Sequence, residues 1–255
     1  MVDYSRILRL SILQLRKKYV GTSVGLLWTF VLPAIQSLYY IFIFGYVFRQ
    51  RSLNDGLPYI PWFLSGFSVW IFFSETIMSS LNLLKSNASL ITNFRIDQRH
   101  LYVASIVSIF PTFIVMVVAT FVLGFDQISL HLLPFIFSIL GLYLLFLICL
   151  LCSLVMGLIG LLLPDIAIIF PVLLQLGLFT TYAVVPASTF PSFYNNILSL
   201  NPLNVCIALF RGLLSSPISS SQIFLLFVYL PIFQFLVFWS WKRYKLFSTP
   251  IASRL

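Results

Sequence analysis

From Ile166 to Phe210 the chain carries no charged residue. A straight helix over this stretch would be roughly 68 Å long at a rise of about 1.5 Å per residue, more than twice the hydrocarbon thickness of a bilayer. The stretch therefore has to break. This predicts a membrane span over 166–185, followed by two short helices near 191–200 and 202–214. Proline and asparagine supply the breakpoints, at Pro186, Pro191, Asn195, Asn196, Asn201 and Pro202.

The rest of the chain is equally apolar. Hydrophobic residues make up 60% of the 255 residues and charged residues only 8%, whereas soluble domains carry roughly a quarter charged residues. Such a chain cannot cover itself with a solvated surface, so we expect an all-α integral membrane protein. At about 20 residues per crossing, one transmembrane domain over 1–255 accommodates roughly six helices. The other spans are predicted at 22–48, 58–80, 101–123, 132–163 and 220–241.

The distribution of Lys and Arg predicts the orientation, because cytoplasmic segments are enriched in these residues. With six spans, all but three of the 15 basic residues fall on one side, the exceptions being Arg49, Arg51 and Arg211. A seventh crossing would divide them almost equally. We therefore expect both termini in the cytoplasm and 187–214 as an outer re-entrant helical hairpin between helices five and six, shielded by protein or water. The net charge of +9 arises from basic residues that gather on one side of the predicted spans, so it does not indicate a nucleic-acid partner.

Residues 3–18 predict an amphipathic helix, so we assign 1–20 as an interface helix lying on the membrane. Its apolar side comprises Tyr4, Ile7, Leu8, Ile12 and Leu15. Basic residues occupy much of the opposite side, although Leu10 and Leu13 interrupt it, and the cluster would lie near anionic lipid headgroups. An ordinary positive anchor for the first span fits the pattern equally well. The basic cluster comprises Arg6, Arg9, Arg16, Lys17 and Lys18.

Gly21 and Gly25 follow the basic cluster. Small residues four positions apart let two helices approach closely. This spacing therefore predicts a helix contact at the start of the first span.

Several kinds of chemistry lack the residues that they need. The sequence has no G-x-x-x-x-G-K phosphate loop, its two histidines cannot assemble a metal site, and no carboxylate pair lies within the spans. Glu75 is the one ionisable residue well inside a span, where it would either pair at a helix contact or act on a substrate. A pump without energy-coupling residues of its own has to use the energy of another subunit.

Three motifs are spread along nearly the whole chain. The pattern Y-x-G-x-x-x-G-x-x-W occupies 19–28 and precedes Pro33 and an aromatic span. PYIPWFLSGFSVWIFFSE occupies 58–75, and SLNPLNVCIALFRGLL occupies 199–214. In this order and spacing they resemble the polysaccharide-exporting ABC transporter permeases, which are the O-antigen (Wzm-type) and teichoic-acid export subunits.

The resemblance implies a non-catalytic permease that forms a homodimer and binds two separate ATP-binding cassette subunits. This chain would bind no cofactor, and ATP and Mg²⁺ would bind the partner subunits. The segment 84–98 would be the coupling helix that docks on the ATPase. Its candidate contacts are Asn87, Arg95, Asp97 and Arg99. Without the resemblance, 87–98 would be interpreted as a solvated loop, or as a short helix started by Asn87 or Ser89.

The implied substrate is an undecaprenyl-diphosphate-linked polysaccharide that crosses a bacterial inner membrane. It would be the O-antigen of lipopolysaccharide, with teichoic acid and capsular polysaccharide as alternatives. The basic cluster would attract the diphosphate, and the outer helices would cap the channel. Phe, Trp and Tyr form 17% of the chain; they can stack on sugar rings, although they are also common at lipid interfaces. Candidates for the substrate path are Tyr39, Tyr40, Phe179, Tyr182 and Arg211.

Two positions depart from the family pattern. NFRIDQRH lacks the proline of the Phe-Pro-Arg run that often follows the coupling helix, and LPDI keeps only Asp165 of an Arg-Asp pair. Two other classes of protein were weighed. An independent carrier would need intramembrane ion pairs or inverted repeats, and a membrane-embedded transferase would need clustered His, Asp or Glu. Neither feature is visible in the sequence.

Overall fold

The computed structural model describes residues 4–47, 58–94, 96–128 and 131–252. Within these ranges the chain forms helices joined by turns, without a β-strand. Five of the described helices are long and apolar enough to cross a membrane. The chain is therefore the all-α, multi-pass membrane protein expected from its composition. These candidate spans are Gly25–Tyr46, Tyr59–Ser86, Gln98–Leu123, Leu132–Leu162 and Ser220–Tyr244.

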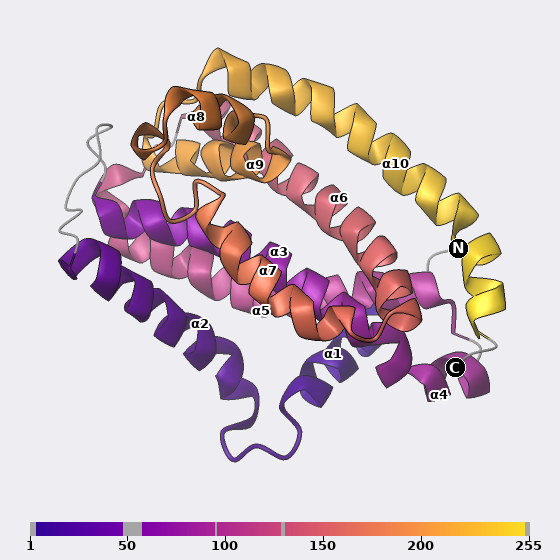
Figure 1. The fold of residues 1–255 in the computed structure, drawn as a ribbon. Helices are drawn as coiled ribbons and strands as arrows, with labels where there is room; N and C mark the ends of the chain where they lie inside the picture. The colour runs from indigo at the N-terminus through magenta and orange to yellow at the C-terminus, as the bar shows by residue number, and fades with distance from the viewer. Residues whose placement is uncertain (1–3, 48–57, 95, 129–130, 253–255) are drawn as a thin grey trace.

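Ten α-helices follow one another in the described part of the chain (Figure 1). They are α1 (Tyr4–Tyr19), α2 (Trp28–Tyr40), α3 (Tyr59–Ser86), α4 (Ala88–Phe94), α5 (Gln98–Leu123), α6 (Leu132–Leu162), α7 (Ile166–Phe179), α8 (Ser192–Ser199), α9 (Pro202–Arg211) and α10 (Ser220–Ala252). A π-helical segment, Ile41–Val47, continues α2. Short 3₁₀ turns lie at Gly25–Leu27, Phe125–Gln127, Ala187–Thr189 and Gly212–Leu214.

α3 is the central helix of the bundle. It packs against α5, α6, α7 and α9, and 67% of its most apolar window is buried, compared with 17% for the first span and 11% for α10. The first span and α10 therefore expose most of their side chains on the surface of the bundle. α6 approaches α3 closely because Gly160 has no side chain; a Cβ atom there would meet the backbone carbonyl of Leu81.

The bundle has two different ends (Figure 1). At one, which we call the α4 end, α1, the start of α5 and the later part of α10 come together with α4. Leu10, Leu84, Leu101 and Tyr244 share one buried cluster there. α8 and α9 lie toward the opposite end, the α8 end.

α1 uses a different face for the bundle than its amphipathic pattern indicates. Leu10 and Ser11 are buried, whereas Leu8 and Ile12, on the predicted apolar side, are 58% and 46% exposed. Leu10 therefore contacts the bundle together with Ile7 of the predicted apolar side, whereas Leu8 and Ile12 remain on the open surface. This explains why a leucine interrupts the basic side.

The predicted fifth span is shorter than expected. α7 ends at Phe179 and has 14 residues, which corresponds to about 21 Å. The hydroxyls of Thr180 and Thr181 donate to the carbonyls of Gly177 and Leu178, so the chain leaves the helix in turns before 185. α7 by itself falls short of the roughly 30 Å hydrocarbon thickness.

α8 and α9 occupy the positions where the sequence predicts two short helices. Their axes differ by 86°. The bend follows from Asn201, whose side chain accepts a hydrogen bond from the Leu203 amide at 3.0 Å, and from Pro202 at the first position of α9. An Asn-Pro pair thus ends one helix and starts the next.

The prediction that Gly21 and Gly25 bring two helices together is wrong. Both lie between α1 and α2, with φ of 85° and 58°, and a Cβ atom at either position would have no neighbour within 4 Å. These glycines supply left-handed backbone where the chain turns from α1 into the first span.

Candidate functional site

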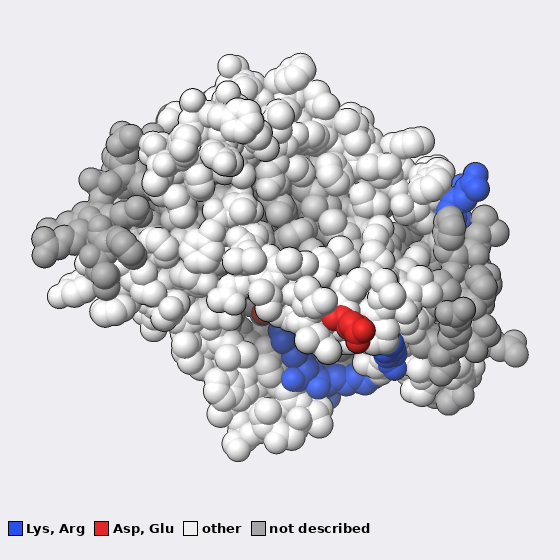
Figure 2. Space-filling model, viewed as in Figure 1, with Lys and Arg blue, Asp and Glu red and all other residues white. Residues whose placement is uncertain are grey.

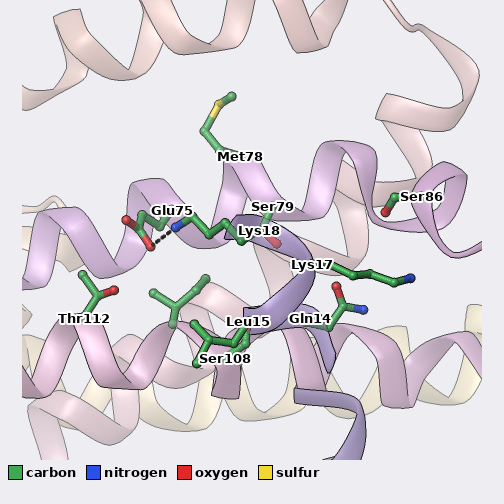
Figure 3. Close-up of a pocket in the computed structure, with 11 residues that line it drawn as sticks. Gln14, Leu15, Lys17, Lys18, Glu75, Met78, Ser79, Ser86, Ser108 and Thr112 are labelled. Carbon is green, nitrogen blue, oxygen red and sulfur yellow. Dashed lines mark hydrogen bonds and ion pairs between the residues drawn. The ribbon is translucent and has the colours of Figure 1, made fainter. Parts of the chain in front are cut away.

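Two adjacent lysines attach α1 to α3 at the α4 end. Lys18 Nζ lies 3.1 Å from Glu75 Oε2, and Lys17 Nζ donates to Asn87 Oδ1 at 2.9 Å. Figure 3 shows Lys18 and Glu75 pointing toward each other. The one carboxylate that the sequence places well inside a span therefore has a cationic partner on α1.

A cavity of about 390 Å³ lies beneath α1, between α1, α3 and α5. Eight of its eleven lining residues have polar side chains (Figure 3). Burial by itself would lower the pKa of Lys18, but the charge and hydrogen bond of Glu75 outweigh burial and raise the pKa above its ordinary value. Lys18 thus stays protonated at neutral pH and keeps the cavity cationic on that side. The polar lining residues are Gln14, Lys17, Lys18, Glu75, Ser79, Ser86, Ser108 and Thr112.

The predicted basic cluster divides into two groups. Lys17 and Lys18 line the cavity. Arg6, Arg9 and Arg16 are exposed on α1 and do not line it. In Figure 2, basic side chains gather over α1 and near the end of α10, while most of that face carries no charge. Positive charge is thus concentrated at the α4 end of this face.

The predicted coupling segment is a short helix, α4, framed by two internal contacts. Asn87 is buried, and its amide donates to the carbonyl of Leu83 at 2.8 Å. Asp97 accepts from the backbone amide of Arg99 at 3.0 Å and caps α5. Arg95 lies outside the described residues. These side chains fix the segment, and its exposed residues include Lys85, Ser89 and Thr92.

Asp97 and Arg99 also join α5 to α10. Arg99 Nη2 contacts Asp97 Oδ2 at 2.6 Å, while Nη1 donates to the carbonyl of Trp241 at 3.1 Å. Burial alone would raise the pKa of Asp97, but the hydrogen bonds and charge of Arg99 lower it below its ordinary value. Asp97 is thus ionised at neutral pH, and the pair holds the end of α10 beside the start of α5.

A second hollow, of about 520 Å³, lies between α2, α3 and α7. Tyr39 and Tyr40, two of the candidates for the substrate path, both line it. The Tyr40 ring also lies edge-on to the Phe67 ring, with 5.3 Å between the ring centres. Phe179 is not among its lining residues; its ring lies 6.5 Å from that of Phe44. We call this hollow the aromatic groove.

The aromatic groove also contains residues that the sequence reasoning missed. Gln36, Trp70, Ser74 and Gln175 line it. The signal in the sequence was an amide side chain inside an otherwise apolar span. Met78 lines both the groove and the cavity beneath α1, so the two hollows adjoin along α3.

Arg211 and Tyr182 meet at the α8 end. Both line a hollow of about 220 Å³. Arg211 is only 5% exposed; its guanidinium donates to the carbonyls of Trp62 at 3.2 Å and Tyr182 at 2.7 Å and lies 3.7 Å from the centre of the Trp62 ring. The Tyr182 hydroxyl donates to Asn195 Oδ1 at 2.6 Å. These two residues connect α3, the turn after α7, α8 and α9.

Comparison with known proteins identifies a matching family and a relative. The ABC-2 type transporter family matches residues 11–215 of this chain. The O-antigen export system permease protein RfbA of Myxococcus xanthus is 29% identical over 112 residues, which cover 44% of this chain. The match spans 41% of the length of that relative.

Proposed function

Because the chain belongs to the ABC-2 type transporter family, we propose that it is the membrane subunit of an ATP-driven exporter of lipid-linked polysaccharide. O-antigen is the favoured cargo, because the relative named above is an O-antigen export permease. The observation that carries the proposal is the cationic cavity under α1, which adjoins an aromatic groove along α3. Cationic groups attract a diphosphate and aromatic faces stack on sugars, so the two hollows match the two parts of one lipid-linked glycan.

In this proposal the chain is not an enzyme and binds no cofactor. It forms a homodimer in the bacterial inner membrane, and two ATP-binding cassette subunits with ATP and Mg²⁺ dock at the α4 end. The exposed residues Lys85, Ser89 and Thr92 supply the docking surface, while Asn87 and Asp97 hold the coupling segment in place.

Deletion and complementation in the source bacterium test the proposal. Loss of the gene should abolish the surface glycan and leave lipid-linked glycan inside the cell, and the wild-type gene should restore export. Affinity purification of the chain should recover a nucleotide-binding subunit. An unchanged surface glycan in the deletion strain would contradict the proposed cargo, and purification without an ATPase would contradict the proposed partner.

We assign the diphosphate to the cavity that Lys17 and Lys18 line. Changing both lysines to Gln should impair export, because two of the charges that attract the headgroup are lost. Arg6→Gln with Arg9→Gln is the matched control, since it removes the same charge from α1 outside the cavity. Glu75→Gln breaks the ion pair and keeps Lys18, so export above that of the lysine variant would support a role for the positive charge. Equal loss in both double variants would contradict this assignment.

The proposed orientation places the α4 end in the cytoplasm. Single cysteines at Arg243, near the end of α10, and at Ser188, near α8, are exposed positions suited to labelling in intact cells. A membrane-impermeant maleimide should react with the cysteine at 188 only. Labelling at 243 from outside would overturn the orientation.

A further inference from the structure

Two glutamine amides lie within apolar helices on opposite sides of the aromatic groove. Gln36 is near the middle of the span Gly25–Tyr46, and Gln175 is in α7. Both side chains are exposed, and neither has a hydrogen-bond partner among the residues that the structure describes. Ser74 of α3 also lines the groove, as do Tyr39 and Tyr40.

Lipid is a poor environment for such amides. Each carries two N–H donors and an acceptor oxygen, and hydrocarbon offers no partner for them. Polar side chains inside spans therefore face a protein partner or a water-filled path in most membrane proteins. The groove that Gln36 and Gln175 line accordingly requires a polar occupant.

The remaining lining narrows the chemistry of that occupant. Tyr39, Tyr40 and Trp70 add aromatic surface, and none of the Asp, Glu, Lys and Arg residues that the structure describes lines the groove. A pyranose ring has apolar C–H faces and an edge of hydroxyls, which suit aromatic faces and amides respectively. The volume of about 520 Å³ falls within the roughly 300–1,000 Å³ typical of small-molecule sites.

We propose that the groove is a binding track for uncharged sugar residues of the polymer, in which the amides and Ser74 bind hydroxyls and the aromatic rings stack. This inference rests on the proposed function and assigns the sugar-binding side chains. Its location is consistent with that function, because Met78 borders both the groove and the cationic cavity. A diphosphate in the cavity would leave the sugars attached to it beside the groove. The proposed track consists of Gln36, Tyr39, Tyr40, Trp70, Ser74 and Gln175.

Photo-cross-linking in exporting cells tests the occupant directly. p-Benzoylphenylalanine replaces Tyr39, which is 60% exposed, or Phe235 of α10, which is 65% exposed and outside the groove. After irradiation the protein is purified, and the adduct is examined with a carbohydrate stain and by mass. We expect a glycan-bearing adduct from position 39 and none from position 235. An adduct at 39 that contains only lipid, or only a second copy of the chain, would overturn the sugar track.

Amide variants test the hydrogen bonds. Gln36→Leu and Gln175→Leu should each slow export about threefold, and together about tenfold, as expected for the loss of one or two neutral hydrogen bonds. Gln234→Leu is the matched control; it removes a span amide from α10, where Gln234 contacts Tyr143, outside the groove. The double variant should also yield less glycan adduct at position 39, whereas the control should leave the adduct unchanged. Normal export together with an unchanged adduct would overturn the role of the amides.

The outcomes separate this inference from the proposed function. If the deletion strain keeps its surface glycan, both fail. A second outcome is that the deletion strain loses its surface glycan while the position-39 variant exports at the wild-type rate and yields no glycan adduct. In that case the exporter assignment stands and the sugar track is wrong.

Discussion

Lys18 in α1 and Glu75 in α3, which are 57 positions apart in sequence, form an ion pair with 3.1 Å between Nζ and Oε2. The pair joins α1 to α3, the central helix of the bundle. Its side chains are 44% and 26% exposed, so solvent screens part of the attraction.

We expect a double-mutant cycle to detect this pair. Lys18→Met and Glu75→Gln should each lower the thermal stability of the detergent-purified protein, and the double variant should lose less than the sum. The interaction energy should be about 0.5–1 kcal/mol, as for partly exposed pairs. Additive effects of the two substitutions would show that the pair contributes nothing to the attachment of α1.

The close approach of α6 and α3 gives a second prediction. Gly160→Ala should destabilise the protein by about 1–3 kcal/mol, because the new methyl group meets the rigid backbone carbonyl of Leu81. Gly45→Ala is the control, since a Cβ atom there would meet the Tyr59 ring at an ordinary 3.5 Å. Thermal unfolding and membrane yield would measure both. Equal tolerance at the two positions would contradict the described packing.

Arg211 should be intolerant of substitution, including by lysine. Arg211→Ala would leave the carbonyls of Tyr182 and Ala183 without the guanidinium that they bind, and a buried acceptor without a donor costs about 1–3 kcal/mol. Lysine cannot reproduce the planar fork of donors. We expect a loss of at least about 2 kcal/mol for either change in thermal unfolding. Arg16→Ala, at an exposed position, should be nearly neutral. A lysine variant with wild-type stability would show that the several donors of the guanidinium are not needed at this position.

Tyr182→Phe should loosen α8 specifically. It removes the hydroxyl that donates to Asn195 at 2.6 Å, which corresponds to about 1 kcal/mol. Hydrogen exchange of the amides in 192–199 should become faster, whereas exchange in α6 should not change. Tyr143→Phe is the matched control because its hydroxyl makes a longer, exposed contact of 3.4 Å with Gln234. Unchanged exchange in α8 would argue against this attachment.

The contact between Asp97 and Arg99 predicts a pH dependence. The folded protein holds the pKa of Asp97 below its ordinary value of 3.8, so the pair stabilises the fold fully above that value. This contribution, about 1 kcal/mol, is lost as the pH falls through the lowered pKa. Asp97→Asn should therefore destabilise the protein at pH 7 and progressively less below pH 3.8. A difference between variant and wild type that stays constant down to the lowest pH would contradict this assignment.

The sequence predicts the long helices well because lipid imposes a local rule. Every backbone group in a span needs a partner, so long apolar runs such as 132–163 become helices whatever surrounds them. The break at Asn201 and Pro202 is equally local, since one side chain caps and the next ring fits the first helical turn.

The end of α7 could not be predicted in the same way. After the turn that ends α7, the backbone amide of Tyr182 donates to Asn204 Oδ1 at 2.9 Å. The partner comes from another helix, 22 positions later. The glycines at 21 and 25 show a related limit, because their spacing fits close helix packing and a left-handed turn alike.

The candidate site was partly predictable. The aromatic pair at 39 and 40 follows from composition and resemblance, and both rings line the groove. The amides at 36 and 175 could not be assigned to one site from the sequence, because that assignment requires knowing that α2 and α7 border the same hollow. Arg211 appeared in the sequence as a basic residue near the outer helices, but its backbone partners depend on the tertiary fold.

The guanidinium of Arg211 also affects how the chain matures. Its partner on α3, the carbonyl of Trp62, is made 149 residues earlier, and synthesis proceeds from the N-terminus. The α8 end of α3 therefore gains its final contacts only after α9 has been made. A nascent chain that is released before α9 has been made would lack these contacts, and that end of the bundle would be exposed to cellular proteases.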